Sequence, residues 1–261
     1  MPELPEVESY RRLAAGTALD RPIASVLSPD AWYLKRGAVG EALTAALVDR
    51  RFVAARRRGK LMMLDTDDGT ILGLRFGMSG RLLVDGAPGV DRLLYGRPAT
   101  DPRHHRFTVV FDDGGSLIVS DPRRLGGVEL DPDLSRLGPD ALGVTLPELR
   151  AALAGSQTAL KARLLDQSHL AGVGNLIADE VLWRAALSPL RPAGGLSPAA
   201  LRRLHTHLTD GLEDLIRRGG SHTGDLMPHR RPGGLCPRDG TGLVRDTVGG
   251  RTTWWCPKHQ R

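Results

Sequence analysis

The sequence predicts an α+β protein of more than one domain, in which a β-sandwich precedes a helical region. Between about Ile23 and Leu130, short apolar runs alternate with turn clusters at regular spacing, a pattern typical of a sandwich or barrel rather than of βαβ units. After two breaks, at 131–133 and 137–139, the apolar positions repeat at helical spacing. We therefore expect a domain boundary near residue 135.

The chain begins Met-Pro-Glu-Leu-Pro-Glu-Val-Glu, and proline followed by acidic residues is ordinary for the start of a helix. If Met1 is removed, Pro2 becomes an N-terminal secondary amine with a pKa roughly near 8. Such an amine can attack a sugar carbon and form an iminium intermediate. Glu3 could move the protons that this chemistry needs, and Glu6 is expected to order either the N-terminal turn or the opened sugar. Position alone favours the plain helix start.

The region that follows is expected to form strands. Two candidate hairpins turn at Asp67-Asp68-Gly69 and at Asp112-Asp113-Gly114-Gly115. The predicted strands are Phe52–Ala55, Leu61–Leu64, Ile71–Leu74, Phe107–Phe111 and Leu117–Val119. A loop from about Gly86 to Arg103, which contains three prolines, interrupts them and is expected to be mobile.

The second half carries helix signals. Thr145 and Glu148 have the spacing of a capping box, and Ser197 with the proline after it opens a long amphipathic helix that ends at Gly219-Gly220. Between these lie two short predicted helices, 160–167 and 176–183, joined by a glycine-rich turn. Together they predict a helix-turn-helix-like element, whose backbone N–H groups could bind phosphate.

Composition narrows the class of protein. A net charge of +6 favours an anionic partner, nucleic acid first, while an aromatic content of 4% argues against a single-strand binder built on stacking platforms. The apolar runs are too short to cross a bilayer, and the acidic start is unlike a secretory signal. With only two cysteines, we expect a cytoplasmic, reducing location and no membrane.

Six segments resemble, in chain order, the formamidopyrimidine-DNA glycosylase and endonuclease VIII family. They are the initial Pro-Glu-Leu-Pro-Glu-Val-Glu, then Arg-Gly-Lys (58–60), Gly-Met-Ser-Gly (77–80), Asp-Pro-Arg-Arg (121–124), Gly-Val-Gly-Asn (172–175) and Gly-Arg-Thr (250–252). The resemblance covers nearly the whole chain. It implies a catalytic β-sandwich domain with an N-terminal helix (1–135), a helix-two-turn-helix domain (136–225) and a zinc-finger-like β-hairpin (226–261).

The resemblance implies a monomeric base-excision repair enzyme that excises a damaged, oxidised base from double-stranded DNA and then cleaves the abasic site. Pro2 would attack C1′ and form a Schiff base, with proton transfer by Glu3. Lys60 would reach the sugar-phosphate of the lesion. Arg251 would hold the phosphate there and assist δ-elimination after β-elimination.

Five further residues match DNA-contacting positions of the family. Met78 would fill the gap left by the flipped nucleotide, and Arg123 would pair with the base opposite the lesion. Leu125 takes a wedge position that is usually Phe in the oxidised-purine branch, which leaves the lesion class open. Asn175 would hold phosphates that flank the lesion. His104 matches a DNA-contacting histidine, although a surface histidine without a role fits as well.

The C-terminal segment resembles a zinc finger with two altered ligands. Cys-Pro-Arg-Asp, sixteen residues and Cys-Pro-Lys-His stand where the family has two Cys-x-x-Cys pairs. Aspartate and histidine also ligate Zn²⁺. The implied ligands are Cys236, Asp239, Cys256 and His259. Two alternatives remain: Asp239 makes a turn while His222 or His229 supplies the fourth ligand, or the hairpin holds no metal.

Two other functions stay open at this point. A non-catalytic binder of damaged DNA could use the same scaffold, and an enzyme could act mainly on abasic sites or on pyrimidine lesions. These alternatives stay open because of three departures from the family pattern: Leu125, the altered finger and the short segment 221–235. Lys161, a possible second amine nucleophile, is expected to contact DNA or solvent instead.

Overall fold

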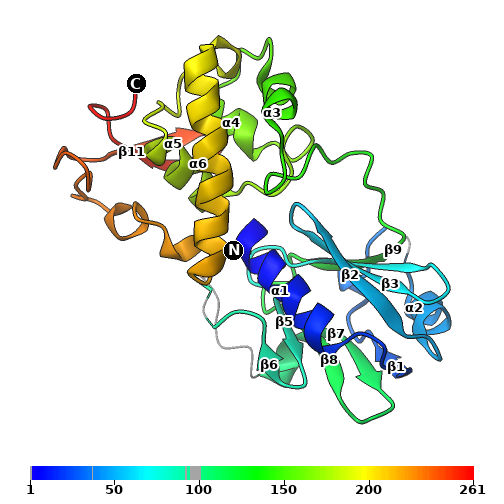
Figure 1. The fold of residues 1–261 in the computed structure, drawn as a ribbon. Coiled ribbons are helices and arrows are strands. Elements are labelled where there is room, and N and C mark those ends of the chain that lie inside the picture. Colours follow the sequence, from blue (N-terminus) through cyan, green and yellow to red (C-terminus); the bar gives the residue numbers. More distant parts are fainter. Residues whose placement is uncertain (1, 37, 92, 95–100) are drawn as a thin grey trace. The chain divides into compact units, whose positions relative to one another are not determined.

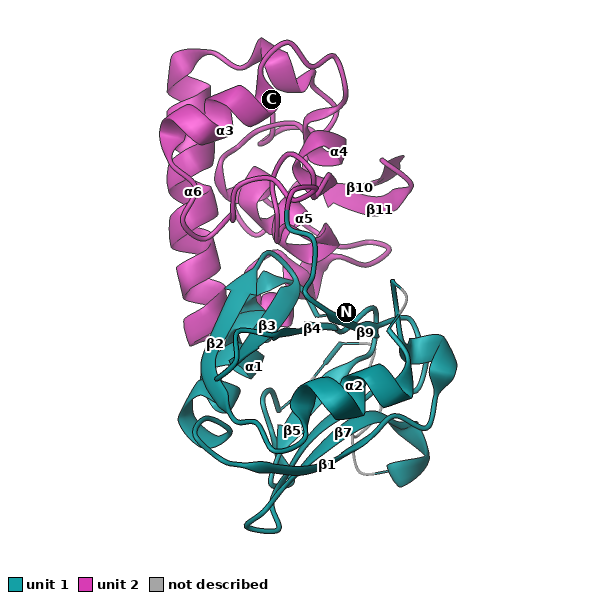
Figure 2. Cartoon of the chain, turned by 90° about the vertical axis from the view of Figure 1, so that its right-hand side faces the viewer, with its two compact units in different colours: residues 1–134 teal, residues 135–261 magenta. Residues whose placement is uncertain are grey.

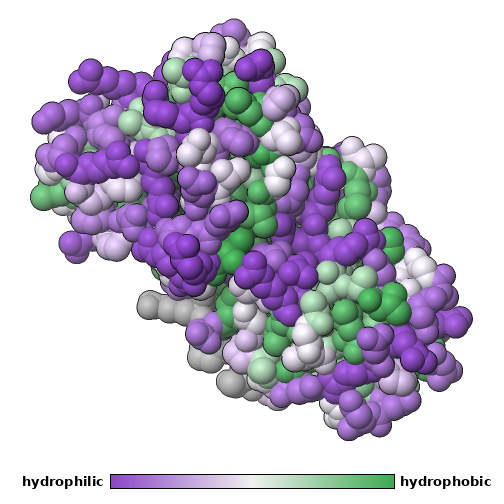
Figure 3. Space-filling view, in the orientation of Figure 1, coloured by the Kyte–Doolittle hydropathy of each residue, from purple (hydrophilic) through white to green (hydrophobic). Residues whose placement is uncertain are grey.

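The computed structural model describes residues 2–36, 38–91, 93–94 and 101–261. The chain forms two compact units, unit 1 from Met1 to Leu134 and unit 2 from Ser135 to Arg261 (Figures 1 and 2). The division of the second half into two domains at residue 225 stays a prediction. Hydrophilic residues cover much of the face drawn in Figure 3, with smaller apolar patches between them.

Unit 1 contains two antiparallel sheets, so the predicted β-sandwich is confirmed. The four-stranded sheet has the order β2 (Phe52–Arg58), β3 (Leu61–Thr66), β4 (Ile71–Arg75) and β9 (Gly127–Leu130). The five-stranded sheet has the order β1 (Ile23–Leu27), β7 (His105–Phe111), β8 (Ser116–Ser120), β5 (Arg81–Val84) and β6 (Ala87–Pro88). All five strands predicted from the sequence lie within these elements.

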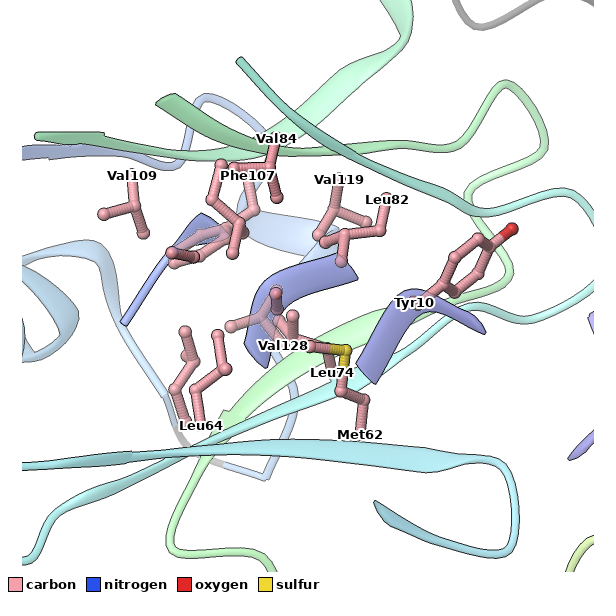
Figure 4. Close-up of a cluster of buried hydrophobic side chains, with 14 of the residues drawn as sticks. Tyr10, Met62, Leu64, Leu74, Leu82, Val84, Phe107, Val109, Val119 and Val128 are labelled. Atoms are coloured by element: carbon pink, nitrogen blue, oxygen red, sulfur yellow. The ribbon is translucent and has the colours of Figure 1, made fainter. Parts of the chain in front are cut away.

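The core of unit 1 lies between the two sheets (Figure 4). Along β7, the buried residues Phe107, Val109 and Phe111 alternate with partly exposed ones, as the two-residue period of a half-buried strand requires. Side chains of the other sheet, including Met62 and Leu74, point toward them. The sandwich therefore gives the turns between its strands a rigid support.

Helical segments and one loop complete the described part of unit 1. The first three helical segments are α1 (Leu4–Thr17), the short η1 (Ala31–Tyr33) and α2 (Gly40–Leu47). Helix α2 was not predicted, because it begins at a glycine and its N-cap Val39 supplies no capping side chain. β6 and the short η2 (Pro102–His104) stand at the two ends of the expected mobile loop, whose residues 92 and 95–100 lie outside the described residues.

Unit 2 is helical and ends in a β-hairpin. Its helices are α3 (Leu146–Leu153), α4 (Leu160–Leu165), α5 (Asn175–Arg184) and α6 (Pro198–Arg217), with the short η3 (Ala193–Gly195), η4 (Ser221–Thr223) and η5 (Met227–His229). The strands are β10 (Val244–Val248) and β11 (Arg251–Trp255). The predicted capping box at Thr145 and the N-cap at Ser197 are both confirmed. None of the described helices has the length and hydropathy of a membrane span.

Candidate active site and nucleic-acid interface

The N-terminal turn holds Pro2 and two buried glutamates. Glu3 is the N-cap residue of α1, so Pro2 precedes the helix by two residues and is itself buried. The Glu3 amide N–H donates to Glu6 Oε2 over 2.8 Å, so Glu6 orders this turn, while its contact with the opened sugar stays a prediction. Glu3 and Glu6 are 0% and 1% exposed. Both carboxylates lie within a few residues of Pro2, where such groups are suited to proton transfer.

A buried ion-pair cluster lies one turn further along α1, around Glu8. Burial raises the pKa of Glu8, but hydrogen bonds from Arg11, Arg12 and Arg57 outweigh this and lower the pKa to about 2. Arg57 comes from β2 and contacts Glu8 at 3.2 Å with both side chains nearly inaccessible. Helix α1 is therefore fixed to the end of β2 by charge as well as by packing.

The same arginine positions the turn that carries Lys60. Arg57 Nη1 donates to the Gly59 carbonyl over 3.0 Å, and Gly59 has a φ of 59°, a conformation that glycine adopts at little cost. Lys60 follows in this β2–β3 turn and is half-buried. Arg57 thus connects the helix behind Pro2 with the turn of Lys60. This link was not predicted, because Arg57 lies in a run of similar cations.

Two loops of unit 1 carry the candidate DNA-inserting residues. The first loop, residues 76–80, contains Met78, and the second loop, residues 121–126, contains Arg123 and Leu125. They touch at Gly77, where a Cβ atom would lie 2.4 Å from the carbonyl carbon of Leu125. Leu125 is 53% exposed, Arg123 is exposed and Met78 is half-buried. Residues more than 40 positions apart are therefore brought into one surface.

His104 lies beside the second loop. It is half-buried at the end of η2, and its carbonyl accepts a hydrogen bond of 2.8 Å from the amide N–H of Asp121. This contact places His104 next to the loop of Arg123. The role of the imidazole stays a prediction.

In unit 2, the glycine-rich turn before α5 is braced by Gln167. The Gly172 N–H donates to Gln167 Oε1 over 3.0 Å, and Gln167 Nε2 donates to the Val173 carbonyl over 3.0 Å. Asn175 is the first residue of α5, and its buried Oδ1 has no hydrogen-bond partner among the residues that the structure describes. Because phosphate oxygens accept hydrogen bonds, a phosphate here would be held by donors, namely the backbone N–H groups of the helix start and the Asn175 Nδ2 amide, and not by this oxygen.

Lys161 is buried, and the prediction that it contacts DNA or solvent was wrong. Its side chain is 0% exposed, and its Nζ lies 2.7 Å from Asp179 Oδ1. It also donates to Thr253 Oγ1 (2.8 Å) and to the Thr252 carbonyl (3.1 Å). A charged side chain stays inside when it is paired and hydrogen-bonded, as here. Lys161 fixes the hairpin to α4 and α5.

Arg251 stands at the start of β11 and is exposed. The preceding Gly249 and Gly250 have φ values of 57° and 69°, the pattern of a tight two-residue hairpin turn. The glycines thus let the hairpin place the arginine directly beside its turn. Whether Arg251 meets the lesion phosphate stays a prediction.

Three of the four predicted metal ligands come together. Ligand atoms of Cys236, Asp239 and Cys256 all lie within 4.8 Å of one another, and both thiols are buried. Two sulfurs and one carboxylate oxygen suit Zn²⁺. His259 is outside this group: its Nε2 shares a hydrogen bond of 3.0 Å with the Trp183 carbonyl. Asp239 also accepts from the Thr241 N–H, so it makes a turn and belongs to the ligand group at once. The identity of the fourth ligand, whether His259, His222 or His229, stays a prediction.

The N-terminal β-sandwich, the helix-two-turn-helix region and the final hairpin define the class of helix-two-turn-helix DNA glycosylases. Residues 1–128 match the formamidopyrimidine-DNA glycosylase N-terminal domain, and residues 137–226 match the formamidopyrimidine-DNA glycosylase H2TH domain. The chain belongs to the formamidopyrimidine-DNA glycosylase family, whose members are DNA glycosylases and abasic-site lyases.

Individual relatives match over their whole length. The formamidopyrimidine-DNA glycosylases of Paracoccus denitrificans and Erythrobacter litoralis are 37% and 35% identical to this chain, with 100% of both chains covered. The structure of Lactococcus lactis Fpg with abasic-site DNA has a TM-score of 0.84, 26% identity and 100% coverage of both chains. A MutM complex with carbocyclic 8-oxo-G DNA has a TM-score of 0.84 and 28% identity, again over 100% of both chains.

Proposed function

We propose that this protein excises an oxidised base from duplex DNA and then cleaves the abasic site, with Pro2 as the nucleophile. The observation that carries the proposal is the buried turn of Pro2, Glu3 and Glu6 at the chain start. A glutamate that is buried beside an amine can exchange protons with it and with the substrate without competition from bulk water. Fold membership alone would not assign these roles.

Two bonds to C1′ of the damaged nucleotide break while Pro2 becomes attached to it. The neutral Pro2 nitrogen attacks C1′, the base departs with the electron pair of its glycosidic bond, and the proton lost from the Pro2 nitrogen neutralises the base. Glu3 donates a proton to O4′, the C1′–O4′ bond opens, and the nitrogen lone pair forms the iminium between Pro2 and C1′. A secondary amine forms this cation directly.

The strand breaks follow from the iminium, which acts as an electron sink. Loss of a proton from C2′ expels the 3′ phosphate by β-elimination, and a second proton loss expels the 5′ phosphate by δ-elimination. Lys60 and Arg251 are the cations assigned to these phosphates, where positive charge stabilises the leaving groups. The product is a one-nucleotide gap.

Recognition uses the five remaining candidates. Flipping the damaged nucleotide costs a few kcal/mol of stacking, which an inserted side chain offsets in part. Met78 and Leu125 supply that wedge, and Arg123 meets the opposite base. His104 and Asn175 hold phosphates. The proposal needs one copy of the chain.

A zinc ion is the cofactor that the donor set fits. Cys236, Asp239 and Cys256 would hold it, and His259 would complete the tetrahedron by leaving the Trp183 carbonyl. The ion would stabilise the hairpin and take no part in the reaction. We expect about one zinc per chain by elemental analysis and a clear loss in Cys256→Ser. Retention of zinc in His259→Ala would remove this histidine from the ligand set.

The test of the chemistry is borohydride trapping on an abasic-site duplex, with mass spectrometry confirming that Met1 is absent. We expect a covalent adduct that maps to Pro2, no adduct at that position in Pro2→Gly, and loss of base excision in Glu3→Gln. A wild-type protein that binds DNA but gives no adduct would be a binding protein. An adduct without excision of any damaged base would restrict the enzyme to abasic sites.

A further inference from the structure

We propose that Asp121 is a positioning residue that sets the first and second loops as one body, so that Met78 and Leu125 enter the duplex together. This inference rests on the proposed function. It assigns to Asp121 neither contact with the substrate nor a part in the chemistry at Pro2.

The carboxylate of Asp121 binds both loops at once. The side chain is completely buried. Oδ1 accepts from Ser79 Oγ of the first loop (2.5 Å) and from the Arg123 N–H of the second (3.1 Å). Oδ2 accepts from the N–H groups of Leu125 (3.0 Å) and Gly126 (2.9 Å). Four donors converge on two oxygens, a number that a carboxylate can accept and an amide oxygen cannot.

The backbone of the same residue fixes the assembly to β7. The Asp121 N–H donates to the His104 carbonyl over 2.8 Å, and the Asp121 carbonyl accepts from Arg106 Nε over 2.9 Å. Asp121 therefore contacts the backbone of the second loop, Ser79 beside Met78, and His104. Each DNA-inserting or DNA-contacting candidate of unit 1 other than Lys60 lies at or next to one of these contacts.

The two loops also fit each other closely. Gly77 has a φ of 53° and no room for a Cβ against Leu125. Arg124 has a φ of 56°, which is unusual for a residue other than glycine, and its guanidinium is held by Asp30 at 2.6 Å. Such a backbone persists only when its surroundings fix it. Asp121 supplies hydrogen bonds on both sides of Arg124.

The hydrogen bonds to Asp121 position the exposed side chains of the second loop. Arg123 and Leu125 turn their side chains outward, while their N–H groups point inward to the carboxylate. Weakening the carboxylate therefore changes where the wedge stands. The four hydrogen bonds that the carboxylate accepts all come from the two loops. A misplacement of about 1 Å can lower a rate by about 100-fold.

The experiment uses Asp121→Asn in the full chain, because asparagine keeps the volume and loses one acceptor. A duplex carries a tetrahydrofuran abasic analogue with 2-aminopurine opposite it, whose fluorescence changes when a side chain is inserted. We expect Asp121→Asn to lose at least about half of the wild-type fluorescence change. Single-turnover excision should fall by at least about tenfold. The excision substrate is 8-oxoguanine or 5-hydroxyuracil DNA, whichever the wild type cleaves faster.

Borohydride trapping on a preformed abasic site separates positioning from chemistry and from folding. Its rate should stay within about threefold of wild type in Asp121→Asn, because that substrate has no base to displace. Ser79→Ala removes only the contact between the loops and should reproduce the fluorescence loss. The matched control is Asp68→Asn, a turn carboxylate that accepts from Thr66 Oγ1 (2.6 Å) and the Thr70 N–H (3.1 Å). It should change neither readout.

Two results would overturn the inference. One is wild-type fluorescence and excision in Asp121→Asn. The other is that Asp121→Asn loses excision and trapping to the same extent and also lowers the melting temperature more than Asp68→Asn does. Asp121 would then be an ordinary stabilising residue. A wild-type protein without a borohydride adduct would refute the proposed function instead, and the fluorescence assay would still decide between coupled and independent loops.

Discussion

Each unit arranges its candidate DNA-contacting segments around one buried aspartate, but the two aspartates have different partners. Asp121 in unit 1 accepts from a hydroxyl and three backbone N–H groups. Asp179 in unit 2 pairs with the side chains of Lys161 (2.7 Å) and Arg230 (2.8 Å), and it accepts from the Trp254 N–H. The first network orders exposed loops. The second joins helices α4 and α5, strand β11 and the segment of Arg230 that precedes the hairpin.

The difference in partners implies a difference in energy. An N–H group that loses its acceptor near the surface can turn to water, and an unsatisfied one costs about 1–3 kcal/mol. A buried cation that loses a paired carboxylate costs more, because it is left inside the protein with its charge less well compensated. Asp121 is therefore suited to adjusting geometry, and Asp179 to holding a structure together.

The largest effect should come from Asp179→Ala. It removes the carboxylate that pairs with the buried Lys161 and Arg230, and we expect the free energy of unfolding of unit 2 to fall by about 3–5 kcal/mol. Urea unfolding of a Trp32→Phe background measures this, because the other three tryptophans all lie in unit 2. The control is the exposed Asp210→Ala on α6. A loss no larger than that of the control would remove the distinction between the two aspartates.

Unit 1 also contains a buried ion pair, and a pH series on Glu8→Gln tests how much it contributes. The folded-state pKa of Glu8 is depressed from 4.5 to about 2, so its stabilisation is complete above pH 4.5 and is lost as the pH falls toward 2. The wild type should exceed Glu8→Gln by about 2–3 kcal/mol at pH 6 and by about 1 kcal/mol at pH 3. A pH-independent difference measured by urea unfolding would contradict the charge interpretation.

The sequence predicted the elements whose signals are local. Strands β2, β3 and β4 have apolar runs with turn residues between them, and α3 and α6 begin with capping residues at Thr145 and Ser197. Helix α2 was missed because its start has no such residue. Local patterns therefore specify an element best when its end is marked by a side chain that contacts its own backbone.

The site was predictable where a motif names the residue, and not where its role depends on a distant partner. Asp121 reads as an ordinary turn residue until folding brings Ser79 to it, 42 positions away in the sequence. Lys161 was interpreted as a surface charge, because no residue near it in the sequence indicates that it pairs with Asp179 on the next helix. The orientation of His259 likewise depends on Trp183, which is remote in sequence. Such roles depend on tertiary contacts, which the pattern of apolar and polar residues along the sequence does not predict.

A smaller effect tests the packing between the two loops of unit 1. Gly77→Ala adds a Cβ against Leu125 at a φ of 53°, whereas Gly86→Ala adds one at a φ of 78° with nothing within 4 Å. Both should lose about 1 kcal/mol to backbone strain, and Gly77→Ala about 1 kcal/mol more from the clash. Thermal unfolding compares them. Equal losses of stability in the two variants would show that the two loops separate freely. That result would contradict the proposed role of Asp121.

The smallest effect concerns the way in which each unit contacts phosphate. Lys60 in unit 1 is a cation, while Asn175 in unit 2 is neutral, so only the first contact releases a counterion from DNA. We expect Lys60→Met to lower the slope of log Kd against log salt by about 1, and Asn175→Ala to weaken binding with the slope unchanged. Titration of a tetrahydrofuran duplex at several salt concentrations measures both. Arg217→Gln, at an exposed arginine of α6, controls for the change in net charge. Equal slopes in all three variants and the wild type would mean that Lys60 does not meet a phosphate, and the turn fixed by Arg57 would then need another explanation.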